Sequence, residues 1–253
     1  MGSSQRLTQI YYNASLSSFE PVTSSSTDAK TLSEEHFHFQ EVLLQHCPEH
    51  LWHNGSCTAG CPRPILLGRH HQKQLHDLHE ALTIAIAGVL DCWWTDKDSR
   101  LWERMPLEKD EEDLLTWLNE QVATGNLPKF SQRVGSWRPN FLVEDNDHAE
   151  KTYKITEINA RYSFSGFLHE SYGQNAMNSL IQEKSALLSG ATDPETIMNG
   201  LFEHFDPRKP LHLLKGAEKG IDLHMFADAV KSRFGMKPCF ITPESLRILP
   251  DDK

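Results

Sequence analysis

The residues best suited to chemistry form the run Glu157-Ile158-Asn159-Ala160-Arg161, which places a carboxylate, an amide and a guanidinium at alternate positions. On a β-strand, successive side chains point to opposite faces, so Glu157, Asn159 and Arg161 would share one face. A carboxylate and an amide oxygen two residues apart suit Mg²⁺, which takes hard oxygen ligands and shares them with substrate phosphates. An arginine in the same row suits a carboxylate or a phosphate, which it holds through two hydrogen bonds. The run predicts a strand that binds a metal ion and an anion.

A half-buried edge strand with polar residues on its wet face gives the same alternation, and short motifs often match by chance. Two neighbouring segments favour the chemical interpretation. Residues 153–156 are rich in side chains typical of strands, and residues 163–166 lead directly into a helical pattern. A strand, a loop and a helix start in this order place ligands at the carboxyl end of the strand.

The composition narrows the class of protein and the kinds of partner to expect. The chain has 253 residues, of which 38% are hydrophobic and 24% charged, enough for one large or two small domains with a sizeable core. The formal net charge of −10 argues against a general nucleic-acid binder. Residues 82–90 form the longest apolar run, far short of the roughly 18 residues of a membrane span. Residues 1–6 lack the apolar stretch of a secretory signal, so we expect a soluble, cytoplasmic protein without a membrane or nucleic-acid partner.

The five cysteines are an odd number in a chain without a visible secretory signal, which favours reduced thiols. Cysteines and histidines crowd together between Cys47 and His71. However, Cys57 and Cys61 are separated by three residues, and no second pair follows at the spacing of a zinc finger. A zinc module is therefore the weaker alternative, and the sequence leaves open whether this segment binds zinc.

Hydrophobic spacing and end signals predict the elements around the polar run. Residues 1–35 are rich in serine and threonine and are predicted to be a disordered tail. Prolines and glycines predict irregular structure over residues 47–70. Residues 141–144 and 151–159 predict the two strands of a hairpin, the second of which carries the polar run. Helices are predicted over residues 34–46, 71–89, 111–122 and 167–188, and over 194–205 with Asp193 as the N-cap and Pro194 at the first helical position.

The end of the sequence predicts a strand–helix–strand unit. Residues 211–214 and 239–242 read as strands, and residues 222–234 between them read as a helix that ends at Gly235. Such a unit implies parallel strands, and a parallel sheet of two strands is a poor domain by itself. The last residues therefore predict the start of a longer domain. The fold class expected is mixed α/β, with helices packed on a mixed sheet and a C-terminal βαβ unit.

The run Glu157-Ile158-Asn159, followed by Ser-Phe-Ser-Gly at 163–166, resembles the metal-binding strand of ATP-grasp ligases. It is most similar to the circularly permuted glutathione synthetase type of eukaryotes, in which a helix and a strand–helix–strand insert follow this strand. Residues 138–142, beginning with Arg138, resemble the arginine-bearing segment beside the active site of that family. The resemblance covers roughly residues 70 to 250. It implies a partial ATP-grasp architecture, with the metal-binding strand in a helix-rich domain at 36–205 and a substrate-binding domain beginning at 206–253.

The resemblance also implies roles for individual residues. Glu157 and Asn159 would coordinate Mg²⁺ bound to ATP, and Arg138 would position the substrate or an acyl phosphate. Arg161 departs from the glutathione synthetase pattern, which has a small residue there, and this argues against glutathione as the product. As in other ATP-grasp enzymes, Arg161 would contact a phosphate or a substrate carboxylate. Lys215, in the run at 214–220, is a candidate contact for the nucleotide at the start of the next helix, although a plain turn explains that run more simply.

The activity implied is ATP-dependent ligation of a small-molecule carboxylate to an amine through an acyl phosphate, with ATP and Mg²⁺ as cofactors. Similar members come from fungal biosynthetic gene clusters, which suggests a secondary-metabolite pathway. In the permuted family, the nucleotide-clamping strands, their lysines and the glycine-rich loop follow the insert, and residues 1–253 show no counterpart. The alternative is therefore a non-catalytic, truncated ATP-grasp-like binding protein or partner subunit, and a homodimer or a complementing chain both stay open.

Overall fold

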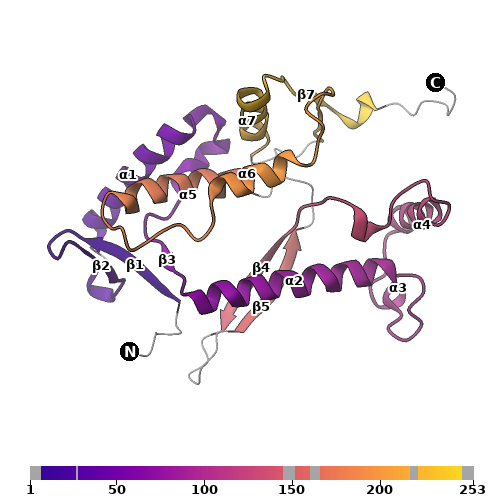
Figure 1. The fold of residues 1–253 in the computed structure, drawn as a ribbon, viewed down its shortest axis with the longest axis horizontal. Helices are drawn as coiled ribbons and strands as arrows, with labels where there is room; N and C mark the ends of the chain where they lie inside the picture. Colours follow the sequence, from indigo (N-terminus) through magenta and orange to yellow (C-terminus); the bar gives the residue numbers. More distant parts are fainter. Residues whose placement is uncertain (1–6, 27, 145–151, 160–165, 217–221, 247–253) are drawn as a thin grey trace. The chain divides into compact units, whose positions relative to one another are not determined.

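The computed structural model describes residues 7–26, 28–144, 152–159, 166–216 and 222–246 (Figure 1). Strands and helices alternate along the chain, so the predicted mixed α/β class is confirmed. The elements are β1 (Thr8–Asn13), β2 (Ser18–Pro21), α1 (Ala29–His46), β3 (Ile65–Leu66), α2 (Arg69–Asp91), α3 (Leu101–Arg104), α4 (Lys109–Ala123), β4 (Arg138–Glu144), β5 (Thr152–Asn159), α5 (Phe167–Gln182), α6 (Pro194–Phe202), β6 (His212–Leu214), α7 (Leu223–Phe234) and β7 (Cys239–Ile241). Short 3₁₀ helices are η1 (Ser24–Ser26), η2 (Glu49–Leu51), η3 (His53–Ala59), η4 (Phe130–Gln132) and η5 (Pro243–Ser245).

The chain divides into two compact units. Unit 1 comprises Met1–Leu67 and Ser136–Lys253, and unit 2 comprises Gly68–Gly135. This division differs from the boundaries expected after residues 35 and 205. Helix α5 packs against both α1 and α6, and the buried cluster of unit 1 draws residues from Phe39 to Val230. These contacts join segments that lie on both sides of residue 205 in the sequence.

The first 35 residues, expected as a disordered tail, contain β1, β2 and the start of α1 in the part that the structure describes. Ile10 is buried, and its N–H donates to Pro64 O at 2.9 Å. The rings of Tyr12 and Phe19 meet edge to face at 5.4 Å across the β1–β2 pair. The run Thr8–Asn13 is rich in side chains that favour strands. Averaging over a segment rich in serine and threonine hides this local signal.

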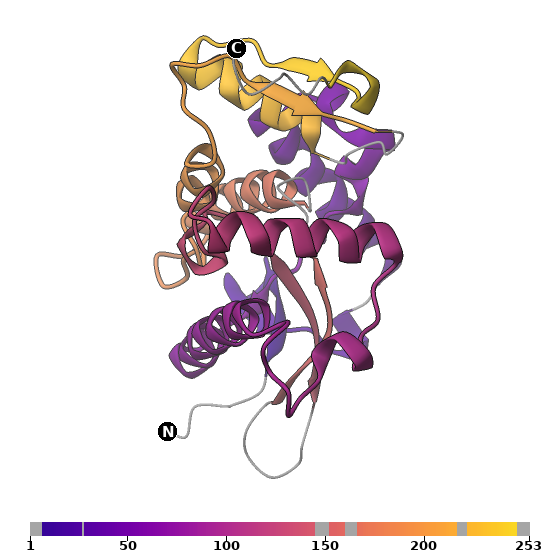
Figure 2. The same ribbon diagram turned by 90° about the vertical axis from the view of Figure 1, so that its right-hand side faces the viewer.

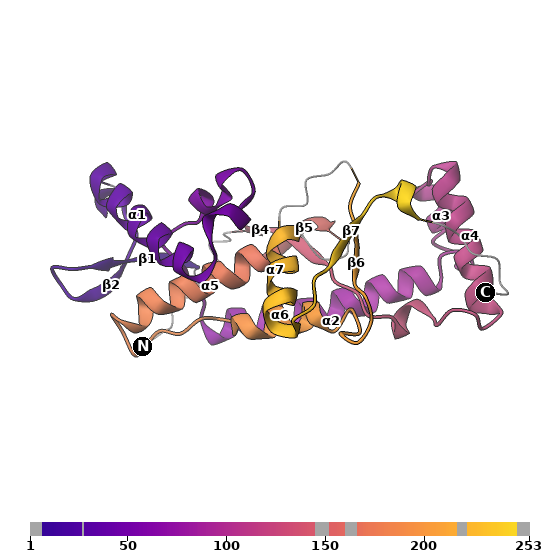
Figure 3. The ribbon, with the colours of Figure 1, turned by 90° about the horizontal axis from the view of Figure 1, so that it is seen from above.

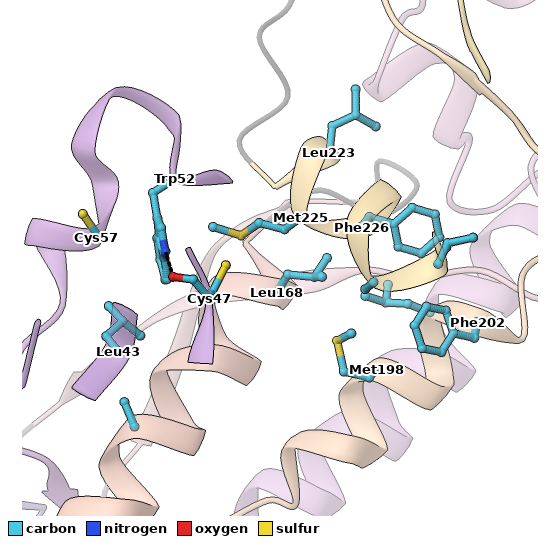
Figure 4. Packing of buried hydrophobic residues seen from close by; sticks show 14 of the residues in the cluster. Leu43, Cys47, Trp52, Cys57, Leu168, Met198, Phe202, Leu223, Met225 and Phe226 are labelled. Atoms are coloured by element: carbon cyan, nitrogen blue, oxygen red, sulfur yellow. Dashed lines mark hydrogen bonds between the residues drawn. The ribbon is translucent and has the colours of Figure 1, made fainter. Parts of the chain in front are cut away.

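The core of unit 1 lies between α1, α5, α6 and α7 (Figure 4). Leu43, Leu168 and Phe226 are almost completely buried within it. The indole Nε1 of Trp52 donates to Cys47 O at 3.0 Å, so the polar edge of this large side chain is satisfied (Figure 4). This core holds α5 in place. Helix α5 is the first helix after the strand predicted to bind a metal ion.

The predicted βαβ unit is confirmed. Strands β6 and β7 are parallel, with Leu213 opposite Phe240, and α7 connects them (Figure 2). Gly235 ends α7 with φ of +67°, a conformation that glycine adopts without strain. The N-cap prediction for α6 is also confirmed, because the Asp193 carboxylate accepts from Glu195 N at 3.0 Å. The described strands form a three-stranded sheet (β2-β1-β3) and two pairs, β4–β5 and β6–β7.

Unit 2 contains α2, α3, α4 and η4. Trp93 and His71 are buried there, whereas Ile84 and Trp117 are exposed. Helix α2 contacts η4, which holds the two ends of the unit together. In the part of the chain that the structure describes, no helix combines the length and the apolar character needed to span a membrane.

Candidate functional site

The β4–β5 hairpin gathers four polar side chains on one face. The strands are antiparallel, with Arg138 opposite Asn159 and Asn140 opposite Glu157. Residues directly opposite each other in such a pair point to the same side of the sheet. Glu157 and Asn159 therefore share a face, as the alternation predicted, and Arg138 lies beside them on the neighbouring strand.

Asn140 is a member of this group that the sequence did not single out. Its side-chain Nδ2 donates to Glu157 Oε2 at 2.8 Å. The hydrogen bond orients the carboxylate and occupies one of its oxygens, which leaves the other for a cation or a donor. Asn140 lies two residues after Arg138, but only the register of the hairpin shows which residue it faces.

A β-bulge interrupts the hairpin next to this group. The register shifts between Asn140 and Phe141, so Thr156 has no cross-strand partner. The Thr156 hydroxyl donates to Asn140 O at 3.2 Å. Beyond the bulge, Lys154 rather than Ile155 shares the face of Glu157.

Because of the bulge, the charged side chains of both strands lie on one face of the hairpin, together with the exposed Leu142. On the charged face, the Lys154 ammonium pairs with the Glu144 carboxylate at 2.5 Å. On the opposite face, the rings of Phe141 and Tyr153 meet at 5.2 Å. Ile158 also lies on the apolar face, with 38% of its surface exposed.

The Asn159 amide has a buried atom without a hydrogen bond. Its Nδ2 is inaccessible to solvent and has no partner in the described part of the chain. Leaving a buried polar atom unpaired costs about 1–3 kcal/mol, so such an atom marks a place that a bound group would stabilise. An amide offers its oxygen to a cation and its nitrogen to an acceptor such as a phosphate or carboxylate oxygen.

The guanidinium of Arg138 lies against the start of α5. A Cβ added at Gly166, the N-cap residue of α5, would lie 3.4 Å from Arg138 Nη1. Gly166 has φ of +87°, which side chains other than glycine rarely adopt. A guanidinium beside a helix N-terminus forms an electropositive corner, because the first N–H groups of the helix also favour an anion.

Two further site residues were predicted from the sequence. Arg161 lies outside the described residues. Lys215 follows β6, and its N–H donates to Ile241 O at 2.8 Å, which extends the β6–β7 pairing. The rest of the predicted turn, at 217–221, also lies outside the described residues, so the proposed nucleotide contact of Lys215 stays a prediction.

The donor set on the hairpin fits Mg²⁺. Glu157 is exposed and has a carboxylate oxygen that Asn140 does not occupy, and Asn159 supplies an amide. Mg²⁺ commonly takes one or two protein oxygens and completes its octahedron with water and substrate phosphates. Within the described ranges, no group of three or more histidine, cysteine or acidic side chains is placed to hold a metal ion. A metal ion on this face would therefore depend on a ligand for the rest of its coordination.

The cysteines between Cys47 and His71 have a different character. Cys47 and Cys57 are buried, and Cys61 is exposed. Burial, reinforced by the negative charge of Asp228, raises the pKa of the Cys47 thiol to about 12. Zinc binds the thiolate, so a thiol that stays protonated is a poor ligand. The structure favours a packing role for Cys47, which belongs to the core cluster.

Two polar side chains, the fully buried Asp222 and the half-buried His169, hold the first turn of α5 in place. The Asp222 carboxylate is fully buried, and its Oδ2 accepts from Leu168 N at 3.0 Å. His169 shares a 2.9 Å hydrogen bond with the Ser56 hydroxyl and packs edge to face on Trp52 at 4.8 Å. Burial lowers the pKa of His169, and the nearby Asp222 charge opposes this shift. No pattern in the sequence singles out this cluster, because its members are far apart along the chain.

Residues 78–253 match the family model described as the AnkG N-terminal domain, and the chain belongs to that family. The chain is also 28% identical over 250 residues to a protein of Aspergillus thermomutatus named "ATP-grasp enzyme ankG". The match covers 96% of this chain and 48% of that relative, so the chain spans about half the length of the relative. No solved structure matches the chain.

Proposed function

We propose that the chain is the part of an ATP-grasp ligase that carries a metal-binding strand, and that the enzyme joins a small-molecule carboxylate to an amine through an acyl phosphate. The name of the Aspergillus relative supports the ATP-grasp class. The observation that carries the proposal is the register of the β4–β5 hairpin. It places Arg138, Asn140, Glu157 and Asn159 on one face, next to the start of α5.

The proposed roles follow from the chemistry of these side chains. Glu157 and Asn159 would hold Mg²⁺, which supplies charge neutralisation to the phosphates of ATP. Asn140 orients the Glu157 carboxylate through its hydrogen bond. Arg138 would hold an anionic oxygen of the substrate or of the acyl phosphate at the electropositive corner near Gly166. Arg161 and Lys215 are proposed as further contacts to phosphate or carboxylate groups.

The narrower assignments rest on the resemblance around Glu157. The Glu-Ile-Asn run and the following Ser-Phe-Ser-Gly support the permuted glutathione synthetase type, and the similarity to fungal cluster members supports a secondary-metabolite pathway. A cytoplasmic location suits the use of ATP. It also suits the free thiols at all five cysteines, because a reducing compartment keeps thiols in this form.

A second candidate function is that of a partner subunit, or a binding protein that no longer uses ATP. The observation that favours it is that, within the described residues, no group of three or more histidine, cysteine or acidic side chains is placed to hold a metal ion. Further nucleotide contacts would then come from a complementing chain or from a second copy in a homodimer.

The first experiment is calorimetric titration of Mg-ATP into the 253-residue chain and into two variants. The test variant combines Glu157→Gln with Asn159→Ala. The control is Glu144→Gln, which removes a carboxylate from the same face on the other side of the bulge. The proposal expects binding in the native chain and the control, and at least tenfold weaker binding in the test variant.

The other outcomes separate the two candidate functions. Equal binding by the native chain and the test variant would show that the metal ligands are wrongly assigned. No binding by any of the three proteins would favour the partner subunit over an ATP-binding chain.

A further inference from the structure

A cavity of about 180 Å³ lies within unit 1 and is lined by residues of the β1–β2 pair, of α1 and of the C-terminal half of α5. Figure 3 shows how these elements are arranged. None of its lining residues belongs to the β4–β5 hairpin. The lining residues are Tyr11, Tyr12, Phe19, Glu34, Glu35, His38, Pro62, Arg63, Pro64, Met177, Leu180, Ile181 and Lys184.

The inner surface of the cavity is apolar. Leu180 and Ile181 of α5 are buried, and the rings of Tyr12 and Phe19 form part of the opposite wall. An apolar cavity of about 150 Å³ holds benzene. A volume of about 180 Å³ therefore suits a ligand with one aromatic ring or a branched aliphatic group.

Two charged side chains of the lining, Arg63 and Glu35, already pair with each other. Arg63, only 4% exposed, forms two hydrogen bonds to the Glu35 carboxylate at 2.6 and 3.1 Å. Its guanidinium also lies 5.0 Å from the centre of the Tyr11 ring. The pair builds one wall of the cavity and presents little net charge to a ligand, because each ion neutralises the other.

The lining holds two further charged groups that can bind a ligand. The Lys184 ammonium lies over the Tyr12 ring at 4.9 Å, and within the described residues it forms no ion pair with a carboxylate. Glu34, on α1, is 3.8 Å from the Lys30 ammonium, and both side chains are largely exposed. An ion pair at this distance on the surface contributes little free energy, so the Glu34 carboxylate remains able to bind another cation. The cavity thus combines a cation just after the end of α5 with an anion on α1.

We propose that this cavity binds a free α-amino acid with an apolar or aromatic side chain. The side chain fills the apolar interior, the carboxylate binds Lys184, and the ammonium group binds Glu34. A zwitterion supplies both charges at once, whereas a simple amine or a simple acid leaves one of the two protein groups without a partner.

The position of the cavity on α5 makes it an accessory site. Phe167 starts α5 next to Gly166 and Arg138, whereas Ile181 lies near the other end of the helix. At about 1.5 Å of rise per residue, roughly 20 Å separate Phe167 from Ile181. An amino acid in the cavity would therefore not contact the candidate metal-binding face. It would act on that face only through α5.

Calorimetry with four probes tests the proposal. The probes are L-phenylalanine, L-leucine, 2-phenylethylamine and 3-phenylpropionate, each titrated without nucleotide so that the result does not depend on the ATP proposal. We expect both amino acids to bind, and each singly charged analogue to bind about tenfold more weakly than phenylalanine, a difference of about 1.4 kcal/mol. The absence of amino-acid binding at millimolar concentration would overturn the proposal, as would an analogue that binds as tightly as phenylalanine.

Two charge-removing variants sharpen the test. Lys184→Met should weaken the binding of phenylalanine and phenylpropionate but leave the affinity for phenylethylamine unchanged. Glu34→Gln should weaken the binding of phenylalanine and phenylethylamine but leave the affinity for phenylpropionate unchanged. Glu183→Gln is the control, because Glu183 is exposed next to Lys184 and does not line the cavity. All three positions are exposed, so the variants should fold normally. Variants that bind the probes like the native chain would overturn the assignment of the charges.

Discussion

At the residue scale, the Asn140–Glu157 hydrogen bond is the most specific feature of the candidate site. The amide holds the carboxylate in one orientation, and a ligand that is held in place loses less entropy when a metal ion binds. Glu157 and Asn159 were recognisable from the sequence, because oxygen-bearing side chains two residues apart on a strand share a face. Asn140 was not, because its partner depends on the register between two strands.

Replacing Asn140 should therefore weaken Mg-ATP binding without unfolding the chain. We expect Asn140→Ala to reduce the affinity about fivefold, because a hydrogen bond to a charged but exposed group contributes about 1 kcal/mol. Calorimetry in the presence of Mg²⁺ measures the change. Glu144→Gln, on the same face but paired with Lys154, should have little effect. An affinity that Asn140→Ala leaves unchanged would show that the carboxylate needs no positioning partner.

His169 should make the stability of the fold depend on pH. Burial lowers the pKa of His169 in the folded chain, with Asp222 opposing the shift, so the unfolded chain binds the proton more tightly. The free energy of unfolding should then fall as the pH falls below about 6.5, the ordinary pKa of histidine, until the lowered pKa is reached. Above that window the contribution is constant.

Denaturant unfolding of the native chain and of His169→Gln, at several pH values on both sides of this window, measures the effect. The variant should lose part of the pH dependence. It should not lose all of it, because burial also lowers the pKa of His204. Identical pH dependence in the two proteins would contradict the assignment to His169.

At the element scale, the local signals in the sequence were reliable where they were strong. The Asp193-Pro194 start of α6 and the Gly235 end of α7 appear in the structure as predicted. The hairpin around Glu157 was also predicted, but its bulge was not, because nothing in the order of side chains marks Thr156 as the extra residue. The β1–β2 pair was missed, since its strand signal lies within a segment dominated by serine and threonine.

Two glycines should respond in opposite directions to the same substitution. A Cβ at Gly60 would lie 2.5 Å from the buried Phe39 ring, so Gly60→Ala should destabilise the fold by about 1–3 kcal/mol. A Cβ at Gly200, on the exposed side of α6, would meet no atom within 4 Å. Gly200→Ala should therefore stabilise the fold by about 0.5–1 kcal/mol, because alanine loses less conformational entropy in a helix. Denaturant unfolding measures both, and a shift in the same direction would contradict the packing at Gly60.

At the scale of the whole molecule, the sequence predicted the mixed α/β class and the βαβ unit but not the division into units. Helical periodicity shows which face of a helix is apolar, and it does not show which distant helix covers that face. The contact of α5 with both α1 and α6 is of this kind. Because of such contacts, residues 1–67 and 136–253 form one compact unit.

The two units should differ in local stability. The described buried cluster lies wholly in unit 1, whereas the buried side chains of unit 2 are His71 and Trp93. Amides of α1, α5 and α7 should therefore exchange with solvent more slowly than those of α2 and α4. Hydrogen exchange followed by mass spectrometry measures this difference. Equal protection in the two sets of helices would show that unit 2 gains stability from contacts other than its own buried residues.

The unpaired Thr156 has a consequence for how relatives of this chain are expected to vary. Exchanging its side chain would alter one hydrogen bond, whereas removing the residue would join Ile155 directly to Glu157 and leave a regular strand. Ile155 would still lie opposite Phe141, and Lys154 would still share the face of Glu157, so the charged side chains would stay on one face. Relatives that keep the four polar residues should therefore differ here by substitution or by loss of this one residue, without any change in which side chains share that face.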